Sequence, residues 1–420
     1  MELNGVLKNA AKLVTPSKAE ESETNKIAEE VIEKVNACAV SQKIKAALQA
    51  GGSVAKGTWL PGISDIDFFL VFDYDTFSER SAELSNYAER ILRKSFRVTR
   101  LHGSRDYFSA KHRKYALEIV PVLDISHGEK ARNTTDYSVL HVRWLAKQIK
   151  KNPKLKTEIR LAKQFFKAAG VYGAESYIRG FSGHVLEILV VYYGSFTKLA
   201  KSILKWKYQE TIDIRSYYKN SRDIFEKLNK SKLQSAIILV DPIEKERNAA
   251  AAFDHESFIL AKEACHEFFD KPSPEFFKEK KFSVEELKKK KKELKLIVVD
   301  AARVSGKPDV IGAALRKKFE QLHSTFFADD FVVQDSGKLI ENNSGKFWFY
   351  FEPNALPAKK LHIGPPVKFA ENARAFRKKW KSAKVKDGRL MVEIKRKYVK
   401  PEQLLKDVIK KDKSLSFRVY

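Results

Sequence analysis

The chain has 420 residues, of which 43% are hydrophobic and 11% aromatic. This apolar content is enough for several folded cores and excludes a wholly disordered chain. The 80 lysines and arginines outnumber the 53 aspartates and glutamates, which gives a net charge of +27. A surface this basic attracts polyanions, and we expect nucleic acid rather than an acidic membrane. Charge alone does not separate RNA from DNA.

No apolar run approaches the roughly 18–20 residues of a membrane span. The N-terminal residues lack the charged-then-apolar layout of a signal peptide. Two cysteines cannot make a disulfide framework or a four-cysteine zinc site. We therefore expect a soluble, cytoplasmic protein.

The first 140 residues are predicted to alternate strands and helices. Residues 1–50 show helical spacing and are expected to form two helices, the second ending at Gly51. Residues 66–73 are a short apolar run typical of a buried strand. The remaining expected elements are a helix at 81–94 and strands at 96–101 and 115–123. Such alternation predicts an α/β unit.

The rest of the chain divides into a mainly helical region and a region of mixed elements. Apolar residues recur at helical spacing in 141–150, 158–169 and 184–205, and 237–241 is an expected short strand. Later expected elements are strands at 294–300, 331–335, 346–352 and 388–396 and helices at 310–326, 369–383 and 402–411. The sequence thus predicts an α/β and α+β multidomain chain, divided as 1–140, 141–270 and 271–420.

Asp65 and Asp67 are the most informative polar pair. On a strand they project from one face, while Ile66 and Phe68 fill the other. Two like charges this close repel, and a bound divalent cation compensates them. Oxygen ligands favour Mg²⁺ or Mn²⁺ over zinc. Glu118 on a later strand would add a third carboxylate, and three carboxylates can hold two metals about 4 Å apart.

A turn rich in glycine precedes this pair. In Gly51-Gly52-Ser53, backbone amides and the hydroxyl can approach phosphates at a helix start. Residues 52–58 do not form a P-loop, because no lysine follows Gly57. Each motif is common in other contexts when taken alone. The order of turn, acidic strand and later acidic strand is far more specific.

The string GGSVAKGTWLPGISDIDFFLVF resembles the active-site signature of the DNA polymerase β-like nucleotidyltransferase superfamily. The resemblance continues along nearly the whole chain and is to the archaeal-type, class I, tRNA CCA-adding enzymes. The segments that carry it are HVRWL, KAAGVYGAESYIRGFSGHVLEILVVYYGSF, DPIEKERNAAA, PSPEFFK and ENARAFR.

The resemblance implies template-independent addition of C, C and A to tRNA from CTP and ATP, with release of pyrophosphate. It also implies a catalytic head (1–140), a nucleotide-selecting helical neck (141–270), and an α+β body and tail that bind tRNA (271–420). The metal-binding, catalytic residues would be Asp65, Asp67 and Glu118. The nucleotide-binding residues would be Gly52, Ser53, Lys56, His141, Lys163, Tyr172 and Arg247, with Arg247 near the base.

Several alternatives remain open at this point. The family usually has aspartate where this chain has Glu118, and Asp124 is the competing third ligand. Arg374, Arg377 and Lys378 could contact tRNA phosphates or form a solvated basic face. The expected partner is the tRNA acceptor arm, not DNA or a membrane, and a homodimer is left open. Competing functions are another terminal nucleotidyltransferase, of poly(A) or oligoadenylate type, and a catalytically silent RNA-binding relative.

Overall fold

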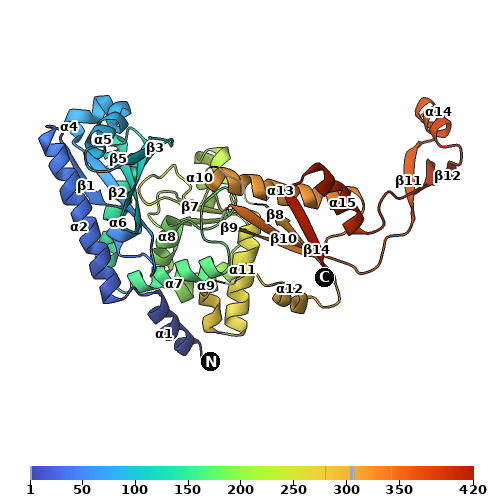
Figure 1. Cartoon of the computed structure of the whole chain (residues 1–420), viewed down its shortest axis with the longest axis horizontal. Helices are drawn as coiled ribbons and strands as arrows, with labels where there is room; N and C mark the ends of the chain where they lie inside the picture. Colours follow the sequence, from blue (N-terminus) through green and yellow to red (C-terminus); the bar gives the residue numbers. More distant parts are fainter. Residues whose placement is uncertain (1, 280, 303–305, 307, 342) are drawn as a thin grey trace. The chain divides into compact units, whose positions relative to one another are not determined.

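The computed structural model describes residues 2–279, 281–302, 306, 308–341 and 343–420. The chain divides into two compact units, Met1–Lys280 and Lys281–Tyr420. Figure 1 colours the chain by sequence, so that the first unit runs from blue to yellow and the second from yellow to red. Each unit encloses apolar clusters of its own. The domain boundaries expected at 140/141 and 270/271 stay predictions.

The first unit combines a sheet with a group of helices. Its strands are β1 (Ala46–Ala50), β2 (Asp65–Phe72), β3 (Val98–Leu101), β4 (Tyr107–His112), β5 (Tyr115–Leu123), β6 (Glu210–Asp213) and β7 (Ile237–Val240). Its helices are α1 (Leu3–Val14), α2 (Lys18–Ser41), α3 (Gly52–Lys56), α4 (Tyr74–Phe77), α5 (Leu84–Leu92), α6 (Tyr137–Lys151), α7 (Leu155–Ala168), α8 (Gly183–Tyr193), α9 (Phe196–Lys205), α10 (Ser221–Lys227) and α11 (His255–Asp270).

The main sheet of the first unit has the strand order β1-β2-β5-β4-β3. The central strands β2 and β5 run parallel, and their neighbours pair antiparallel. Ile66 and Phe68 of β2 are fully buried in a cluster with residues of α2 and α5. The alternating side chains of Asp65 and Asp67 therefore leave the sheet on the face opposite to this core, as the strand pattern predicts.

Residues 46–50 form a strand and not the predicted end of a helix. We expected helix up to Ala50, but α2 ends at Ser41 and β1 follows after a left-handed residue, Lys43, with φ of 55°. The composition AALQA favours a helix in isolation. Antiparallel pairing with β2, from Ala46 opposite Phe72 to Ala50 opposite Phe68, overrides that preference.

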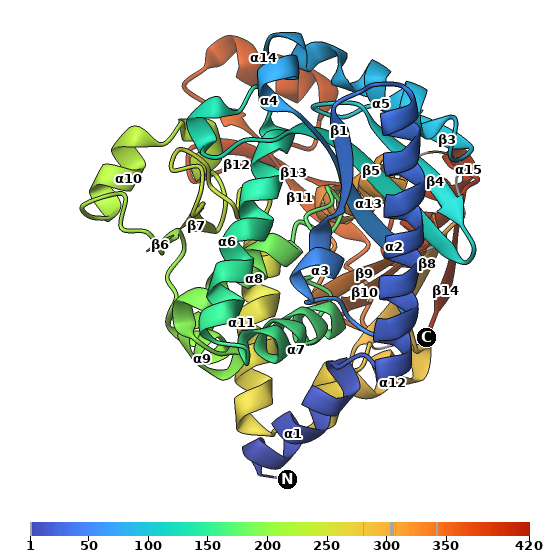
Figure 2. The ribbon, with the colours of Figure 1, turned by 90° about the vertical axis from the view of Figure 1, so that its left-hand side faces the viewer.

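In the first unit, α1, α6, α9 and α11 pack with α7 and α8 around one core. Their core is rich in phenylalanine and includes Phe165, Phe166 and Phe181, all essentially inaccessible to solvent. The short helix α3 follows β1 directly and packs against both β2 and α6. Figure 2 shows α3 (blue) at the place where the sheet meets the green helices α6, α7 and α8. This contact brings the Gly51-Gly52-Ser53 turn to the helical region.

The second unit is an α+β assembly. Its strands are β8 (Lys295–Ala301), β9 (Asp335–Glu341), β10 (Ser344–Phe351), β11 (Lys359–Pro366), β12 (Lys384–Lys386), β13 (Arg389–Lys395) and β14 (Leu415–Val419). Its helices are α12 (Val284–Lys290), α13 (Pro308–Ala328), α14 (Ala370–Lys379) and α15 (Pro401–Lys411). One sheet has the order β14-β8-β10-β9, and a smaller one has the order β11-β13-β12.

The helices α13 and α15 cover one face of the larger sheet, against alternate aromatic residues of β10. The strand expected at 331–335 is wrong, because β9 begins at Asp335 and Phe331 is buried before it as loop. Within the described ranges, no helix combines the length and apolar character needed to cross a bilayer.

A buried ion pair joins the end of the sheet to the start of α6. Asp136 is fully buried and accepts hydrogen bonds from the Arg105 guanidinium and from the backbone N–H of Leu123, Arg132 and Asn133. The carboxylate therefore fixes the point at which the chain leaves β5 and enters α6.

Replacing Asp136 by asparagine should lower the free energy of unfolding of the first unit by about 3–5 kcal/mol, because it leaves the buried Arg105 charge without its counter-ion. Urea unfolding followed by circular dichroism measures this. The matched control is Glu83→Gln, which removes an exposed partner of Arg80 and should change stability little. Equal effects of the two substitutions would contradict the assigned importance of the buried pair.

Candidate active site

The Gly51-Gly52-Ser53 turn lies directly against the acidic strand. The backbone N–H of Gly51 donates to the Asp67 carbonyl at 2.8 Å. Gly52 has φ of +48°, and a Cβ added there would lie 1.8 Å from Oδ2 of Asp67. Only glycine fits this position, since a side chain would be both strained and overlapping. Ser53 is half-buried on α3, and its hydroxyl makes no hydrogen bond to any described residue.

Asp65, Asp67 and Glu118 lie side by side across the parallel pair of strands. In the β2–β5 register Asp67 is opposite Glu118, and Asp65 is opposite Ala116. Burial raises the pKa of Asp67, and the Asp65 charge raises it further. Desolvation by neighbouring residues raises the pKa of Glu118, and the charges of Asp67 and Asp65 raise it further, although the residue keeps an exposed side chain. The three carboxylates thus repel one another, and none of them has an ion-pair partner among the described residues.

This set of donors fits a hard divalent cation. A bound cation stabilises the charged form of a carboxyl group whose pKa is raised. It offsets the free-energy cost of desolvation and the repulsion between neighbouring carboxylates. The carboxylates are adjacent by register rather than converged on one point, because their oxygens do not all lie within 4.8 Å of one another. Asp124 lies beyond the end of β5, is exposed, and pairs with Arg143 at 2.9 Å.

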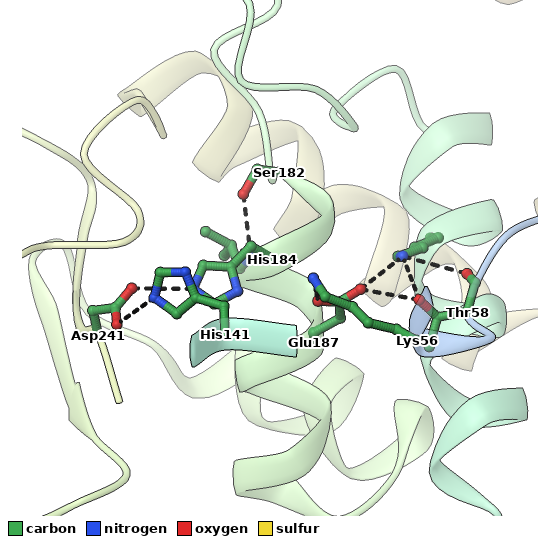
Figure 3. A network of polar contacts seen from close by, with 9 residues as sticks. Lys56, Thr58, His141, Ser182, His184, Glu187 and Asp241 are labelled. Atoms are coloured by element: carbon green, nitrogen blue, oxygen red, sulfur yellow. Dashed lines mark hydrogen bonds and ion pairs between the residues drawn. The ribbon is translucent and has the colours of Figure 1, made fainter. Parts of the chain in front are cut away.

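A second cluster links α3 with the neighbouring helices. Glu187 of α8 accepts from Lys56 Nζ at 2.8 Å and from the Thr58 hydroxyl at 3.0 Å, and Figure 3 labels these three residues. It also accepts from Lys163 Nζ at 3.0 Å. Burial would raise the pKa of Glu187, but Lys163 and Lys56 lower it to about 2. Burial and the nearby Glu187 charge raise the pKa of Tyr172 to about 12. The site therefore places two ammonium groups and a neutral phenol close to the acidic strand.

A third cluster is centred on Asp241, at the end of β7. His141 and His184 donate through Nε2 to its two carboxylate oxygens at 2.9 and 3.0 Å, as Figure 3 shows. Arg247 approaches the same carboxylate at 3.7 Å. Burial and the neighbouring His184 lower the pKa of His141 to about 4, so that its imidazole is neutral near pH 7.

Within the described residues, His141, His184 and Asp241 are the group whose potential metal-ligating atoms all lie within 4.8 Å. The distances are hydrogen-bond lengths, and Asp241 also accepts from the backbone N–H of Ile243 and Glu244. The carboxylate is thereby saturated with donors and approached by a guanidinium. We interpret the group as a hydrogen-bond network rather than a metal centre.

A pocket of 590 Å³ joins these clusters. The lining residues that matter for the site are Gly52, Lys56, His141, His184, Arg247 and Asn248. Gly52 is the link, because it lines the pocket and also abuts Asp67. Ser53, Lys163 and Tyr172 do not line the pocket. Tyr172 and Lys163 instead meet against Gly183 at the start of α8, where a Cβ would lie 3.2 and 3.5 Å from their side chains.

The predicted RNA-binding residues belong to the second unit. Arg374, Arg377 and Lys378 are exposed on α14 in the second unit, and no ion pair joins them to a described residue. Sequence reasoning missed Thr58, His184, Glu187 and Asp241. The available signal was the single carboxylate of Glu187 within the apolar sequence GHVLEILVVYY. The other three carry no local sign of their contacts.

Three segments of the chain match known protein families. Residues 25–141 match the family described as nucleotidyltransferase domain, 157–278 match tRNA nucleotidyltransferase, second domain, and 294–419 match CCA-adding enzyme, C-terminal domain. A solved cytoplasmic RNA terminal U-transferase shares the fold with a TM-score of 0.52 and 13% identity, over 66% of this chain and 99% of that one. The match of residues 25–141 identifies a nucleotidyltransferase, and the shared fold confirms the expected fold class.

Similarity to complete proteins shows which nucleotidyltransferases this chain resembles. The CCA-adding enzyme of Pyrobaculum islandicum is 31% identical over 87% of this chain and 82% of that protein. The CCA-adding enzyme of Methanocaldococcus jannaschii is 28% identical over 97% and 91% respectively. The chain belongs to the CCA-adding enzyme family. Membership implies nucleotide substrates and the use of a divalent metal.

Gly52→Ala should reduce nucleotidyl transfer by about a hundredfold or more, because the new Cβ displaces the Asp67 carboxylate and a shift of about 1 Å can cost that much. The control is Gly62→Ala, which shares the left-handed strain at φ of +76° but has nothing within 4 Å of the added Cβ. Melting temperatures show whether both variants are folded. Equal losses of activity would mean that backbone strain, not the Asp67 overlap, is responsible.

Proposed function

We propose that this enzyme adds C, C and A to the 3′ end of tRNA, using CTP and ATP and releasing pyrophosphate. The observation that carries the proposal is the joint position of Gly52, which abuts the Asp67 carboxylate and lines the pocket with Lys56 and His141. An acidic pair and a pocket with cationic walls, meeting at one glycine, suit a reaction between a hydroxyl and a nucleoside triphosphate.

Asp65, Asp67 and Glu118 would hold Mg²⁺ or Mn²⁺, because their oxygens are the ligands that these ions prefer. When bound, the metal supplies charge neutralisation for the triphosphate and activation of the attacking 3′-hydroxyl. The three carboxylates have no competing ion-pair partner among the described residues, so they remain available.

The remaining site residues would bind the nucleotide. Gly52 and Ser53 offer a backbone and a free hydroxyl to phosphate oxygens, and Lys56 offers an ammonium at the pocket wall. The family resemblance adds His141, Lys163 and Tyr172 for the triphosphate and Arg247 for the base. Support comes from the pocket for His141 and Arg247, and from the shared contact at Gly183 for the other two.

The tRNA would be held largely through its backbone. The relatives are named for adding CCA, and a chain of net charge +27 gains affinity from each phosphate that it neutralises. We propose that the acceptor arm is recognised by shape, with Arg374, Arg377 and Lys378 contacting phosphates. Cytoplasmic location stays a prediction.

Incubation with tRNA that ends before CCA, labelled CTP and ATP, and Mg²⁺ tests the function. We expect two C residues and then one A, after which extension stops. A ladder of adenylates without CTP use would instead identify a poly(A)-type transferase. Binding of tRNA without any incorporation would identify a catalytically silent relative.

Glu118→Gln should lower kcat by about a thousandfold, with little change in the Kd for tRNA, because loss of a metal ligand removes several kcal/mol of transition-state stabilisation. Asp124→Asn should have a mild effect, since that side chain is paired with Arg143 outside the strand. Single-turnover kinetics and filter binding separate the two quantities. The reverse pattern would make Asp124 the third ligand.

A further inference from the structure

Glu187 is an unusual residue for its surroundings. It is 1% exposed and is the single carboxylate of an otherwise apolar part of α8. Burying a carboxylate costs several kcal/mol unless charges and hydrogen bonds compensate it. The sequence could have placed an apolar side chain here at no such cost, so the partners of Glu187 indicate what it does.

Those partners come from two directions. Lys163 lies on α7, beside α8, whereas Lys56 and Thr58 belong to the end of α3 and the residues just after it, next to the acidic strand. Both lysine side chains are largely buried, with 10% exposure for Lys56 and 4% for Lys163. One carboxylate therefore ties the helical region to the turn that carries Gly52.

The two lysines are used differently. Lys163 has three hydrogen-bond donors, and all three are engaged: with the Thr58 carbonyl at 3.3 Å, the Thr58 hydroxyl at 3.1 Å and Glu187 at 3.0 Å. Among the described residues, Lys56 hydrogen-bonds to Glu187 alone, and it lines the pocket. Lys163 and Thr58 thus fix Glu187, and Glu187 fixes Lys56 while leaving two of its donors without a partner in the part of the chain that the structure describes.

The position of Lys56 matters because Asp67 is an alternative partner for its ammonium group. Gly52, where an added Cβ would overlap the Asp67 carboxylate, lies one turn before Lys56 on the short helix α3, and both residues line the same pocket. The charge of Lys56 accordingly opposes the rise in the pKa of Asp67 that burial and Asp65 cause. A lysine has a flexible four-carbon stem and behaves as a mobile point charge. Without Glu187, Lys56 would pair with Asp67 and compete with a cation for that carboxylate.

We propose that Glu187 is a positioning residue that presents Lys56 to the triphosphate and keeps its ammonium group away from Asp67, so that the acidic strand stays available to the divalent metal. The inference rests on the proposed function, in that it takes the pocket to be the nucleotide site and the carboxylates to be the metal site. An apolar side chain at position 187 would stabilise the fold at lower cost, so the buried Lys163–Glu187–Lys56 triad serves the site rather than stability.

The test measures Mn²⁺ binding to the full chain without nucleotide or tRNA, by electron paramagnetic resonance. Glu187→Gln should weaken Mn²⁺ binding about tenfold, because Lys56 moves to Asp67. Lys56→Met should restore most of that loss in the Glu187→Gln protein but change binding less than about threefold in the wild-type protein. Such non-additivity shows that the two residues act through one contact. Equal effects of Lys56→Met in both proteins would overturn the proposal.

Two further variants keep the test decisive. Glu187→Asp retains the charge but is too short to reach both lysines, so it should weaken Mn²⁺ binding in the same direction. It replaces Glu187→Gln in the cycle if the glutamine variant does not fold. The control is Glu158→Gln on α7, which keeps an acceptor for the Phe196 backbone N–H and lies outside the triad; it should leave Mn²⁺ binding unchanged. If Glu187→Asp binds Mn²⁺ like the wild-type protein, charge alone matters and the proposal fails.

The same cycle separates this inference from the proposed function. An enzyme that fails to add CTP and ATP to tRNA, yet shows the non-additive Mn²⁺ binding, would disprove CCA addition and retain the assignment of Glu187. Normal CCA-adding activity, together with additive effects of the Glu187 and Lys56 substitutions on Mn²⁺ binding, would support CCA addition and disprove the assignment of Glu187.

Discussion

The parallel pairing of β2 with β5 is the constraint on which the site depends. In this register Asp67 lies opposite Glu118, and the Gly51 N–H bonded to the Asp67 carbonyl places α3 against the same strand. A slip of one residue would send the carboxylates into the core and turn Ile66 and Phe68 to the opposite face of the sheet. Burial of those two apolar side chains therefore secures the position of the acidic pair.

The elements that the sequence predicted well are those with strong local patterns. The apolar run at 66–73 corresponds to β2, and the helical spacing at 158–169 corresponds to α7, so that both patterns have local physical causes. The strand β1 was misread because its residues favour a helix and only pairing with β2 makes it extended. The strands β4, β11, β12 and β14 also went unpredicted. Of these, β14 pairs with β8, far earlier in the chain, whereas β4 and β12 form hairpins with the strands that follow them directly.

The site divides in the same way. The metal-binding expectation for Asp65, Asp67 and Glu118 could be formed from alternation along strands and from the family resemblance, and the register brings the three together. The partners of Lys56 and His141 could not, because Glu187 lies 131 residues after Lys56 and Asp241 lies 100 residues after His141. Contacts across such separations follow from tertiary packing, which one sequence does not display.

Asp241 is the shared partner of several side chains that line the pocket. One buried carboxylate accepts from His141 and His184, and it also faces Arg247. The two imidazoles donate to this buried anion directly, whereas the Arg247 guanidinium is 40% exposed and approaches it at 3.7 Å. His141, His184 and Arg247 all line the pocket, so that one carboxylate outside the lining holds two of its polar side chains and faces a third.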